Sequence, residues 1–440
     1  MNNAVSKKRF RILALLIVMM TIIGSLPAWS ASSEEGELKP GTVINMQNWQ
    51  QYAQYMPDGM QGMFKGLYFW KFPPDFQIVI GAPHHVIPPK SFLDYTEKYA
   101  SQVKLVNLPD GRHTISGYVS GWPFPNPTDP QKGLKILIDN WFAYVPYLIC
   151  GNTYSGFEDR FGNVYRQTAT FVYRRLSHIG DPGQPLTDPQ AQGMDYSEYV
   201  MVNFPEQAKY TTDLTIYYTD YDKSEDTFLF IPALRRSLRL STAARCTPFI
   251  GSDLILDDPR VNGFNGGFAR FDANVVKEQR ILGDIEENVN IVDNWSNFYQ
   301  PVFFAKPSVG TWEVRDTWVI DVRRIPSEAK GYCYGKRLMW IDKETMMSFW
   351  QDIYDESMKF WKMNVWPVVA TQVPGQAPAI TPNGWANQWD VQNDHLSFWA
   401  FKTPDGLSTG ANAACRNRYG ENMDDVGKYS TVAGLAQVMR

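Results

Sequence analysis

The sequence predicts an α+β fold in which helices come first along the chain and an antiparallel sheet follows. Between residues 91 and 141, apolar residues recur at the spacings of three and four that are typical of amphipathic helices. From about residue 160 the apolar period changes to two, and short polar turns separate the successive runs. The strand–helix–strand alternation of a parallel nucleotide-binding sheet is absent.

The N-terminus has the layout of a secretory signal peptide. Four basic residues lie between positions 7 and 11, and Ile12–Leu26 is a run of 15 residues without a charge. Small residues, Ala28 and Ser30, then precede the expected cleavage site. The alternative is an uncleaved anchor helix, but the run is shorter than the roughly 20 residues of a membrane span. Cleavage removes four basic and no acidic residues, so the net charge goes from −4 to −8.

Three helical segments are expected before the sheet. Residues 45–65 suggest a short helix that is broken at Pro57. Ser91 is expected to cap a second helix, because a hydroxyl can accept from the free N–H groups of a first turn. Asp129 and Pro130 are expected to form the N-cap and first turn of a third helix. The segment before it has four prolines within eight residues and is expected to be irregular.

The strands are expected as a meander. Alternation is clear around Ala169–Tyr173, Leu214–Tyr218 and Trp318–Val322. Three more strands, around Leu338–Trp340, Met347–Ile353 and Lys359–Trp366, are separated by short polar turns. Residues 373–383, rich in Pro, Gln and Ala, are expected to be a linker or an extended strap. The predicted organisation is a signal peptide (1–30), a flexible segment (31–44), a single curved-sheet domain (45–400) and a C-terminal tail (401–440).

The secretion signal is of bacterial type, so the predicted location is the periplasm. No cysteine lies near the cleavage site, which excludes lipid attachment at a lipobox. Four cysteines would then meet an oxidising compartment, where they can form one or two disulfides or remain buried thiols. Three pairings are open. The cysteines are Cys150, Cys246, Cys333 and Cys415.

The composition excludes several classes of function. The chain of 440 residues carries 42 Lys+Arg against 46 Asp+Glu, and this balance argues against a nucleic-acid binder, which needs a basic face. With 4 Cys and 5 His, no metal cluster and no cofactor are expected. The chain is rich in aromatic residues, with 25 Phe, 23 Tyr and 15 Trp. Those rings are the feature that needs an explanation.

No catalytic or metal-binding motif is present. His84 and His85 are adjacent, and on a strand their side chains would point to opposite faces. The acidic residues in Asp253–Asp258 lack the alternation and the glycine of a calcium loop. Cys246 would need a nearby base to act as a nucleophile, and the sequence indicates none. We therefore predict no catalytic residue and no metal ligand.

Two segments remain unusual. Four arginines lie within eleven residues, where they could clamp an anionic head group through bidentate hydrogen bonds. If this stretch is extended from its first arginine, alternate residues share one face. The alternatives are a solvated face or ion pairs with the aspartates of residues 253–258. The second segment, Gly263–Gly267, is expected to be an exposed turn or a plain loop.

The rings on the predicted strands could fill the core, which is the default role of buried aromatic residues. They could also line the concave face of a curved sheet and form an apolar site for a lipid or polycyclic molecule. The candidate ligand-binding residues combine the arginines with these rings: Arg235, Arg236, Arg239, Arg245, Tyr173, Tyr218, Trp318, Trp340, Trp350 and Trp361.

Three sets of motifs, in this order, resemble one family. The first is GYVSGWPFP at 117–125 with Lys132-Gly133, and the second is LSTAARC at 240–246 with Gly251-Ser252-Asp253 and GFNG at 263–266. The third is YGKR at 334–337 and WIDKET at 340–345, with Tyr354-Asp355 and Trp361-Lys362. From about residue 40 to 400, the chain is similar to the periplasmic proteins of domain-of-unknown-function 1329, often labelled outer-membrane lipoprotein-sorting proteins.

The resemblance implies a strongly curved, half-open antiparallel sheet with helices packed on or in its concave face, similar to the lipoprotein-carrier fold. It also implies a non-enzymatic periplasmic carrier or binding protein for lipid-like or other hydrophobic molecules. Its implied partners are a resistance-nodulation-division type exporter and an outer-membrane β-barrel. Two alternatives stay open. One is a structural adaptor between an inner-membrane exporter and an outer-membrane protein, and the other is a hydrolase that uses Cys246 or His84.

Overall fold

We describe the protein from a computed structural model. All of the described residues from Lys39 onward belong to one compact unit. The structure describes residues 38–241, 245–248, 251–258, 260, 263–287, 295–371, 379–382, 385–401, 408–409, 415–416 and 421–439. The predicted signal peptide lies outside these described residues. None of the helices among the described residues is long and apolar enough to cross a membrane.

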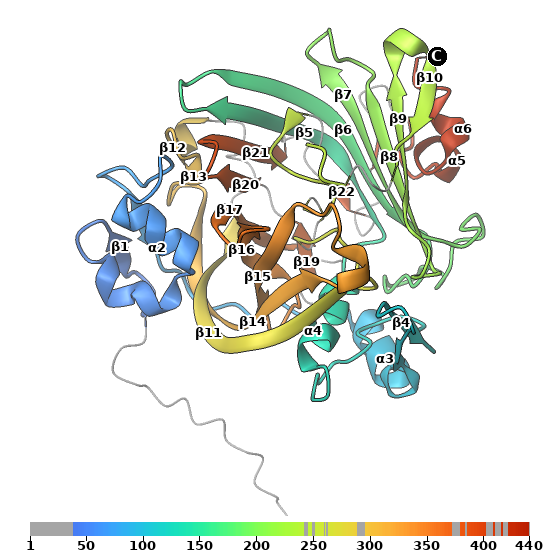
Figure 1. Ribbon diagram of the computed structural model, residues 1–440, viewed down its shortest axis with the longest axis horizontal. Coiled ribbons are helices and arrows are strands. Elements are labelled where there is room, and N and C mark those ends of the chain that lie inside the picture. The colour runs from blue at the N-terminus through green and yellow to red at the C-terminus, as the bar shows by residue number, and fades with distance from the viewer. Residues whose placement is uncertain are drawn as a thin grey trace, which may run out of the picture. The chain divides into compact units, whose positions relative to one another are not determined.

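One large antiparallel sheet organises this unit (Figure 1). Its order is β10-β9-β8-β7-β6-β5-β21-β20-β17-β16-β15-β14-β11, and β22 also pairs with β5. Within the described residues the edge strands β10 and β11 do not pair, so the sheet is open. The strands are β5 Leu148–Asp159, β6 Val164–Arg175, β7 Met194–Phe204, β8 Thr212–Tyr218, β9 Asp226–Ile231, β10 Arg236–Arg239, β11 Phe271–Glu287, β14 Gly310–Arg324, β15 Tyr334–Asp342, β16 Ser348–Asp355, β17 Phe360–Val365, β20 Trp385–Asp390, β21 His395–Phe401 and β22 Ser408–Thr409.

Short helices and two-stranded hairpins surround the sheet. The helices are η1 Trp49–Tyr55, α2 Asp58–Lys65, α3 Lys90–Tyr99, η2 Ala100–Gln102, α4 Lys132–Trp141, η3 Pro232–Leu234, η7 Trp295–Asn297, η8 Pro326–Glu328, α5 Val426–Tyr429 and α6 Val432–Leu435. The hairpins are β1 Val43–Asn45 with β2 Gln77–Val79, β3 Lys104–Asn107 with β4 His113–Ser116, β12 Phe298–Tyr299 with β13 Phe304–Ala305, and β18 Val368–Thr371 with β19 Ala379–Pro382.

The predicted fold class is confirmed: the protein is α+β, and its main sheet is antiparallel and unclosed. The strands lie where the period of two placed them, and helical turns flank Pro57 as expected. The predicted strap at 373–383 lies largely outside the described residues, although its residues 379–382 form β19.

Two predicted helix caps are wrong. Helix α3 begins at Lys90 with Pro89 at the N-cap, and the hydroxyl of Ser91 donates to the carbonyl of Gly180 at 2.6 Å. That hydroxyl therefore serves a tertiary contact instead of a cap. Helix α4 has Gln131 at its N-cap, in a left-handed conformation with φ 62° and no side-chain cap, so Asp129 and Pro130 lie outside the helix.

The two faces of the sheet differ in chemistry. Residues that pair directly across antiparallel strands share a face. Glu198 pairs with Tyr173 and with Thr215, and all three lie on the face that meets segment 245–270, which we call the inner face. Arg337 of β15 meets the same segment, because it contacts Asp258. The opposite, outer face carries mainly apolar side chains.

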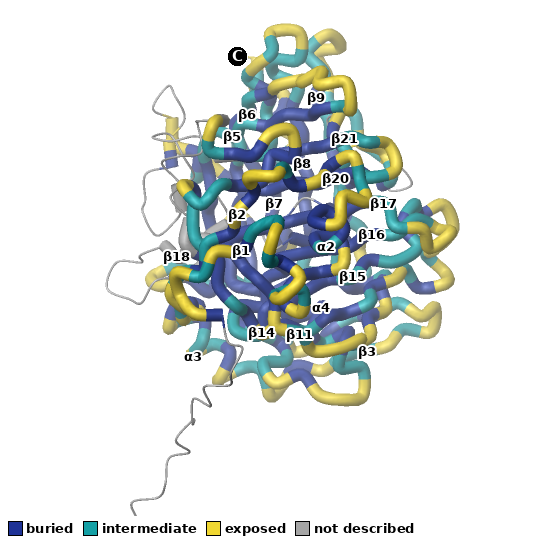
Figure 2. Tube along the Cα trace, turned by 90° about the vertical axis from the view of Figure 1, so that its left-hand side faces the viewer, coloured by how far each residue is buried: buried dark blue, intermediate teal, exposed yellow. Residues whose placement is uncertain are grey.

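The outer face is covered by elements from both ends of the chain. Helices α5 and α6 pack against β5–β9 in one buried apolar cluster, and the Cys150–Cys415 disulfide joins that C-terminal segment to β5. On the other half, the ring of Phe304 lies 5.1 Å from that of Phe72 and 6.0 Å from that of Trp389. Figure 2 shows the strands buried along most of their length, with exposure concentrated at the turns.

Helix α4 bridges the open side of the sheet (Figure 1). Near its start, Gly133 lies so close to β11 that an added Cβ would be 2.4 Å from the carbonyl oxygen of Ala273, which explains the glycine. At its end, Trp141 packs against Tyr196 of β7 and Tyr217 of β8, with ring centroids 5.8 and 5.6 Å away. The helix therefore connects edge strand β11 to strands near the opposite edge.

Candidate functional site

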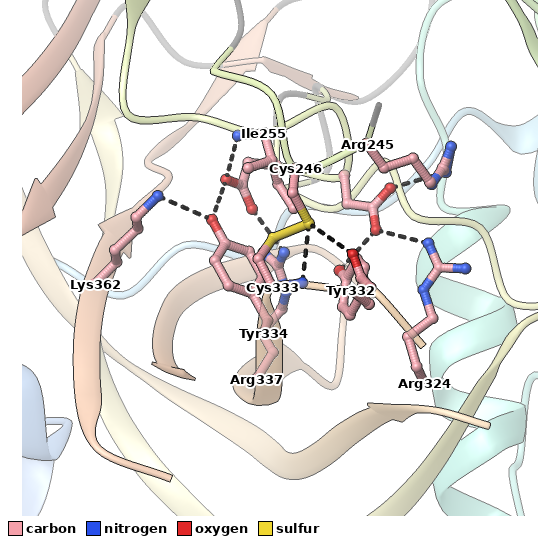
Figure 3. The surroundings of a disulfide bond; sticks show 12 residues. Arg245, Cys246, Ile255, Arg324, Tyr332, Cys333, Tyr334, Arg337 and Lys362 are labelled. Carbon is pink, nitrogen blue, oxygen red and sulfur yellow. Dashed lines mark hydrogen bonds and ion pairs between the residues drawn. A yellow bond between two sulfur atoms is a disulfide. The ribbon is translucent and has the colours of Figure 1, made fainter. Parts of the chain in front are cut away.

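A charged network fills part of the inner face. The segment that follows the predicted arginine cluster is tied to the start of β15 by the Cys246–Cys333 disulfide (Figure 3). The pairing that the sequence left open is therefore Cys150–Cys415 and Cys246–Cys333. Because Cys246 is held in a disulfide, it is not available as a nucleophile in this state.

Asp257 is the first centre of this network. Its carboxylate lies 2.8 Å from Arg245 and 3.1 Å from Arg324, and the hydroxyl of Tyr332 donates to it at 2.7 Å. Burial alone would raise the pKa of Asp257, but the two guanidinium groups outweigh burial and lower it to about 2. Asp257 therefore stays charged and joins the segment to the end of β14.

Asp258 is the second centre. Arg337 lies 2.6 Å from its carboxylate, and the hydroxyl of Tyr334 and the amide of Gln388 donate to it at 2.8 and 3.1 Å. These partners come from β15 and β20, so one aspartate joins the segment to two strands. Figure 3 shows the two partners from β15, Tyr334 and Arg337. In both centres the buried charges are paired and hydrogen-bonded, as buried ions must be.

The four predicted arginines do not converge on one anion site. Arg235 has a left-handed backbone with φ 48° and an exposed side chain, so the stretch is not extended from its start. Arg236 is exposed on edge strand β10, and Arg239 forms an ion pair with Asp226. Arg245 is buried and pairs with Glu225 and with Asp257, which is the ion-pair alternative that the sequence left open.

The predicted rings are also dispersed over both faces. Tyr173 is buried on the inner face, 5.3 Å from the ring of Tyr196. Trp340 and Trp350 are buried on the outer face, where their indole N–H groups donate to Gln279 at 2.9 Å and to Asp352 at 2.8 Å. These two tryptophans have the core role that buried rings take by default.

The three remaining predicted rings are half-buried and bind neighbouring polar groups. Trp318 lies 5.8 Å from the ammonium of Lys132 and 5.4 Å from that of Lys343. The indole of Trp361 donates to Asp390 at 2.8 Å. The hydroxyl of Tyr218 donates to Asp226 at 2.6 Å. None of these contacts brings the three rings to a common site.

A residue that sequence reasoning missed, Arg260, lies at the centre of the inner face. It is 3% exposed, and its guanidinium carbon lies 3.8 Å from the ring centroid of Trp141 and 4.5 Å from that of Tyr196. None of its three guanidinium nitrogens has a hydrogen-bond partner among the described residues. Nothing in the sequence marked this arginine, because it belongs to no motif and to no cluster of charged residues.

The segment Gly263–Gly267 supports this arginine site. Asn265 donates to Glu198 at 3.2 Å and accepts from the hydroxyl of Tyr196 at 2.9 Å. Residues 263–266 are buried and belong to no helix or strand, so the exposed turn is wrong and the plain-loop alternative is confirmed. The bonds of Asn265 hold this loop inside. Burial raises the pKa of Glu198 to about 8, although Arg260 opposes the shift.

A cleft of about 660 Å³ lies at the other end of the inner face. It is bounded by the β5–β6 hairpin, the turn after β7, Gly251 and His395. The imidazole of His395 lies 2.6 Å from the carboxylate of Asp253, and this contact raises the pKa of His395. The apolar walls are formed by Phe157, Val164, Tyr165, Val202 and Ala208.

The histidines considered in the sequence lie with separate carboxylates. His84 is 2.8 Å from Glu313, and His85 is 3.0 Å from Glu344. Arg315 binds both glutamates, at 2.9 and 2.6 Å. Across the described ranges, no group of three or more His, Cys, Asp or Glu residues is placed to hold a metal ion.

Solved structures that the comparison finds are distant in sequence, and the following three have TM-scores below 0.5. One is an outer membrane lipoprotein-sorting protein domain from Vibrio parahaemolyticus (14% identity, TM-score 0.43, 63% of this chain and 92% of that one). Another is a DUF1329 family protein from Desulfovibrio piger (13%, 0.44, 67% and 100%). A third is a LolA superfamily protein from Nitrosomonas europaea (12%, 0.33, 61% and 87%).

A search of curated proteins finds no match. The model of one family, described as protein of unknown function (DUF1329), matches residues 43–420, which is most of the chain. The resemblance that the three sets of motifs indicated is thereby confirmed. This protein belongs to the DUF1329 family.

Proposed function

We propose that this protein is a non-enzymatic binding protein or carrier for lipid-like or other hydrophobic molecules, and that the ligand occupies the 660 Å³ cleft beside the β5–β6 hairpin. The cleft is the observation that carries this proposal. Its volume lies within the roughly 300–1,000 Å³ of small-molecule sites, and its walls are mainly apolar, as such sites require.

The lining of the cleft combines an apolar wall with one polar end. Phe157 and Tyr165 are stacked with ring centroids 5.9 Å apart, and Val202 and Ala208 also line the cleft. Tyr165 is 45% exposed, so a ligand that covers its ring gains apolar burial. At about 0.8 kcal/mol for each buried CH₂ group, a chain of about six would gain about 5 kcal/mol.

We place this function in the periplasm. The predicted signal peptide and the two disulfides support this location, because disulfides persist in oxidising compartments. A resistance-nodulation-division type exporter and an outer-membrane β-barrel remain the proposed partners. They are inferred from the family resemblance.

A structural adaptor is the second candidate, and one observation favours it. The ion pairs of Asp257 and Asp258 occupy part of the inner face that an open apolar cavity would need. A filled interior suits a protein that joins two partners without carrying a ligand. The 660 Å³ cleft distinguishes the two functions, because a carrier needs it to hold a ligand and an adaptor does not.

The test is binding of an uncharged fluorescent probe, N-phenyl-1-naphthylamine, to the purified protein. We expect saturable binding that a fatty alcohol displaces. Ala208→Trp should fill the cleft and weaken binding at least tenfold, because the new ring occupies the space of the probe. Leu67→Trp, at an exposed position away from the cleft, is the matched control and should leave the affinity unchanged.

Two outcomes would contradict the carrier. The first is no saturable binding to the folded wild-type protein, and the second is equal affinity in both tryptophan variants. In either case, crosslinking in intact cells that captures an exporter or an outer-membrane protein would leave the adaptor as the better function.

A further inference from the structure

The guanidinium group of Arg260 is buried without the acceptors that such a group needs. Arginine carries several N–H donors in a rigid plane, and a buried donor without an acceptor is costly. The guanidinium group of Arg260 forms neither an ion pair nor a hydrogen bond with any described residue. The rings of Trp141 and Tyr196 attract the cation through their faces, but they do not satisfy N–H groups that lie in the guanidinium plane.

The two rings form a corner around the guanidinium. Their centroids are only 5.8 Å apart, while each lies 3.8–4.5 Å from the guanidinium carbon, so the rings cannot lie on opposite sides of it. The two rings cover only part of the guanidinium group, so another group can meet the remaining N–H edges of its plane. Trp141 adds a second signal, because its buried indole N–H has no partner among the described residues either.

The neighbouring charges leave Arg260 as the uncompensated one. Arg245 pairs with Glu225, Arg324 pairs with Asp257, and Arg337 pairs with Asp258, so each of these three arginines has a carboxylate. Glu198 forms no ion pair with Arg260, and burial raises the pKa of Glu198 to about 8, so this carboxyl is mostly neutral at pH 7. The corner therefore carries one net positive charge and is suited to one negative charge.

A small cavity adjoins Trp141 but does not reach the guanidinium itself. It has a volume of about 40 Å³ and is lined by Trp141, Tyr217, Glu225 and Phe268 among others, while Arg260 and Tyr196 do not line it, so a group that enters there meets Arg260 only if the intervening side chains move. A water needs roughly 10–15 Å³ of such volume, so the cavity has room for a group of a few atoms. A carboxylate matches the planar fork of a guanidinium, and its single charge matches the single free cation.

We propose that Arg260 anchors a carboxylate of a small ligand at the corner formed by Trp141 and Tyr196. This site is separate from the cleft of the proposed function, and neither proposal depends on the other. The ligand would place its two oxygens against the guanidinium edge, and the aromatic walls would exclude water from the ion pair.

The experiment measures the melting temperature of the full-length mature protein in rising concentrations of sodium acetate, with ionic strength held constant by sodium chloride. A ligand that binds only the folded state raises the melting temperature as its concentration rises. We expect acetate to raise it for the wild type. Arg260→Met, which removes the charge and the guanidinium but keeps an unbranched apolar stem, should weaken the apparent acetate affinity at least tenfold.

Arg236→Met is the matched control, because it removes an exposed arginine from edge strand β10 and should leave the acetate effect unchanged. Arg260→Lys keeps the charge but loses the planar fork, and it should bind acetate more weakly than the wild type. This variant also keeps the test decisive if Arg260→Met does not fold. A direct reading comes from ¹³C-carboxyl acetate, whose resonance should broaden with the wild type and not with the Arg260 variants.

Three outcomes would overturn the proposal. If acetate has no effect on the wild type, buried water alone solvates Arg260. If acetate acts equally on the wild type and the Arg260 variants, its effect is not at this site. If inorganic phosphate stabilises more strongly than acetate in an Arg260-dependent way, the site selects a multivalent anion and not a carboxylate. The binding of N-phenyl-1-naphthylamine in the cleft does not depend on any of these three outcomes.

Discussion

The inner and outer faces of the sheet are held by different kinds of contact. On the inner face, buried carboxylates of one segment pair with arginines from strands far away in sequence, such as Arg324 and Arg337. On the outer face, rings such as Phe304 and Trp389 pack with one another. The aromatic residues of the chain pack on both faces: in apolar clusters on the outer face, and beside the buried charges on the inner face, where Tyr196 packs against Trp141 and Tyr332 against Tyr334. The inner face is where unsatisfied groups and a cleft occur together.

The difference between the faces predicts different responses to mutation. A charge removed from a buried pair leaves its partner uncompensated, and this loss depends little on side-chain volume. When a ring is removed from an apolar cluster, the loss of stability depends on the volume of the cavity that remains and not on charge. Small changes of charge should therefore disturb the inner face most, and changes of volume should disturb the outer face.

The largest effect is expected for Asp258→Asn. The two side chains have nearly the same shape, but Arg337 would remain buried, 3% exposed, without a counter-charge. We expect the free energy of unfolding to fall by about 3–5 kcal/mol. Urea unfolding followed by circular dichroism measures this change. The comparison of the two faces would be broken if the loss were below 1 kcal/mol.

Two further variants complete this test. The double variant Asp258→Asn with Arg337→Met should recover much of the loss, because no charge is then left buried. Asp321→Asn is the matched surface control, because Asp321 pairs with Arg323, which is about half exposed. That pair should contribute less than about 1 kcal/mol.

The predictable part of the fold is the part that local patterns encode. Alternation within a strand is visible in a few residues, so β14–β17 were expected where they lie. The insertion of β20 and β21 between β17 and β5 was not, because strand pairing across hundreds of residues leaves no local signal. The ion pair of Asp258 could not be predicted either, because its partner Arg337 lies 79 residues away in the sequence. Arg260 has no motif at all, and only its surroundings identify it.

The pH dependence of stability should be set by buried carboxyls of the inner face. Burial raises the pKa of Glu198 from 4.5 to about 8, so the folded protein keeps a proton that the unfolded chain releases above about pH 4.5. Where the folded state binds more protons, stability falls as pH rises. Asp213, with a pKa raised by burial to about 7, acts in the same direction. We expect the free energy of unfolding to fall from pH 5 to pH 8.

Glu198→Gln isolates this contribution. In this variant the free energy of unfolding should fall less steeply with pH, by on the order of 1 kcal/mol per pH unit, because the proton on residue 198 no longer titrates. Urea unfolding at pH 5, 6, 7 and 8 measures the slope, and Glu206→Gln at an exposed position serves as the control. Identical slopes for the wild type and Glu198→Gln would show that Glu198 is ionised in the folded protein.

The smallest effect is expected on the outer face, for Phe304→Leu. The side chain is fully buried, with its ring 5.3 Å from that of Trp312 and stacked on it. Leucine keeps most of the apolar volume, so the loss should be about 1–2 kcal/mol, mainly the ring contacts. Thermal unfolding should give the same loss at 0.05 M and 1 M salt, since no charge is involved. A salt-dependent loss, or one as large as that of Asp258→Asn, would mean that the outer face relies on the charged network rather than on its own packing.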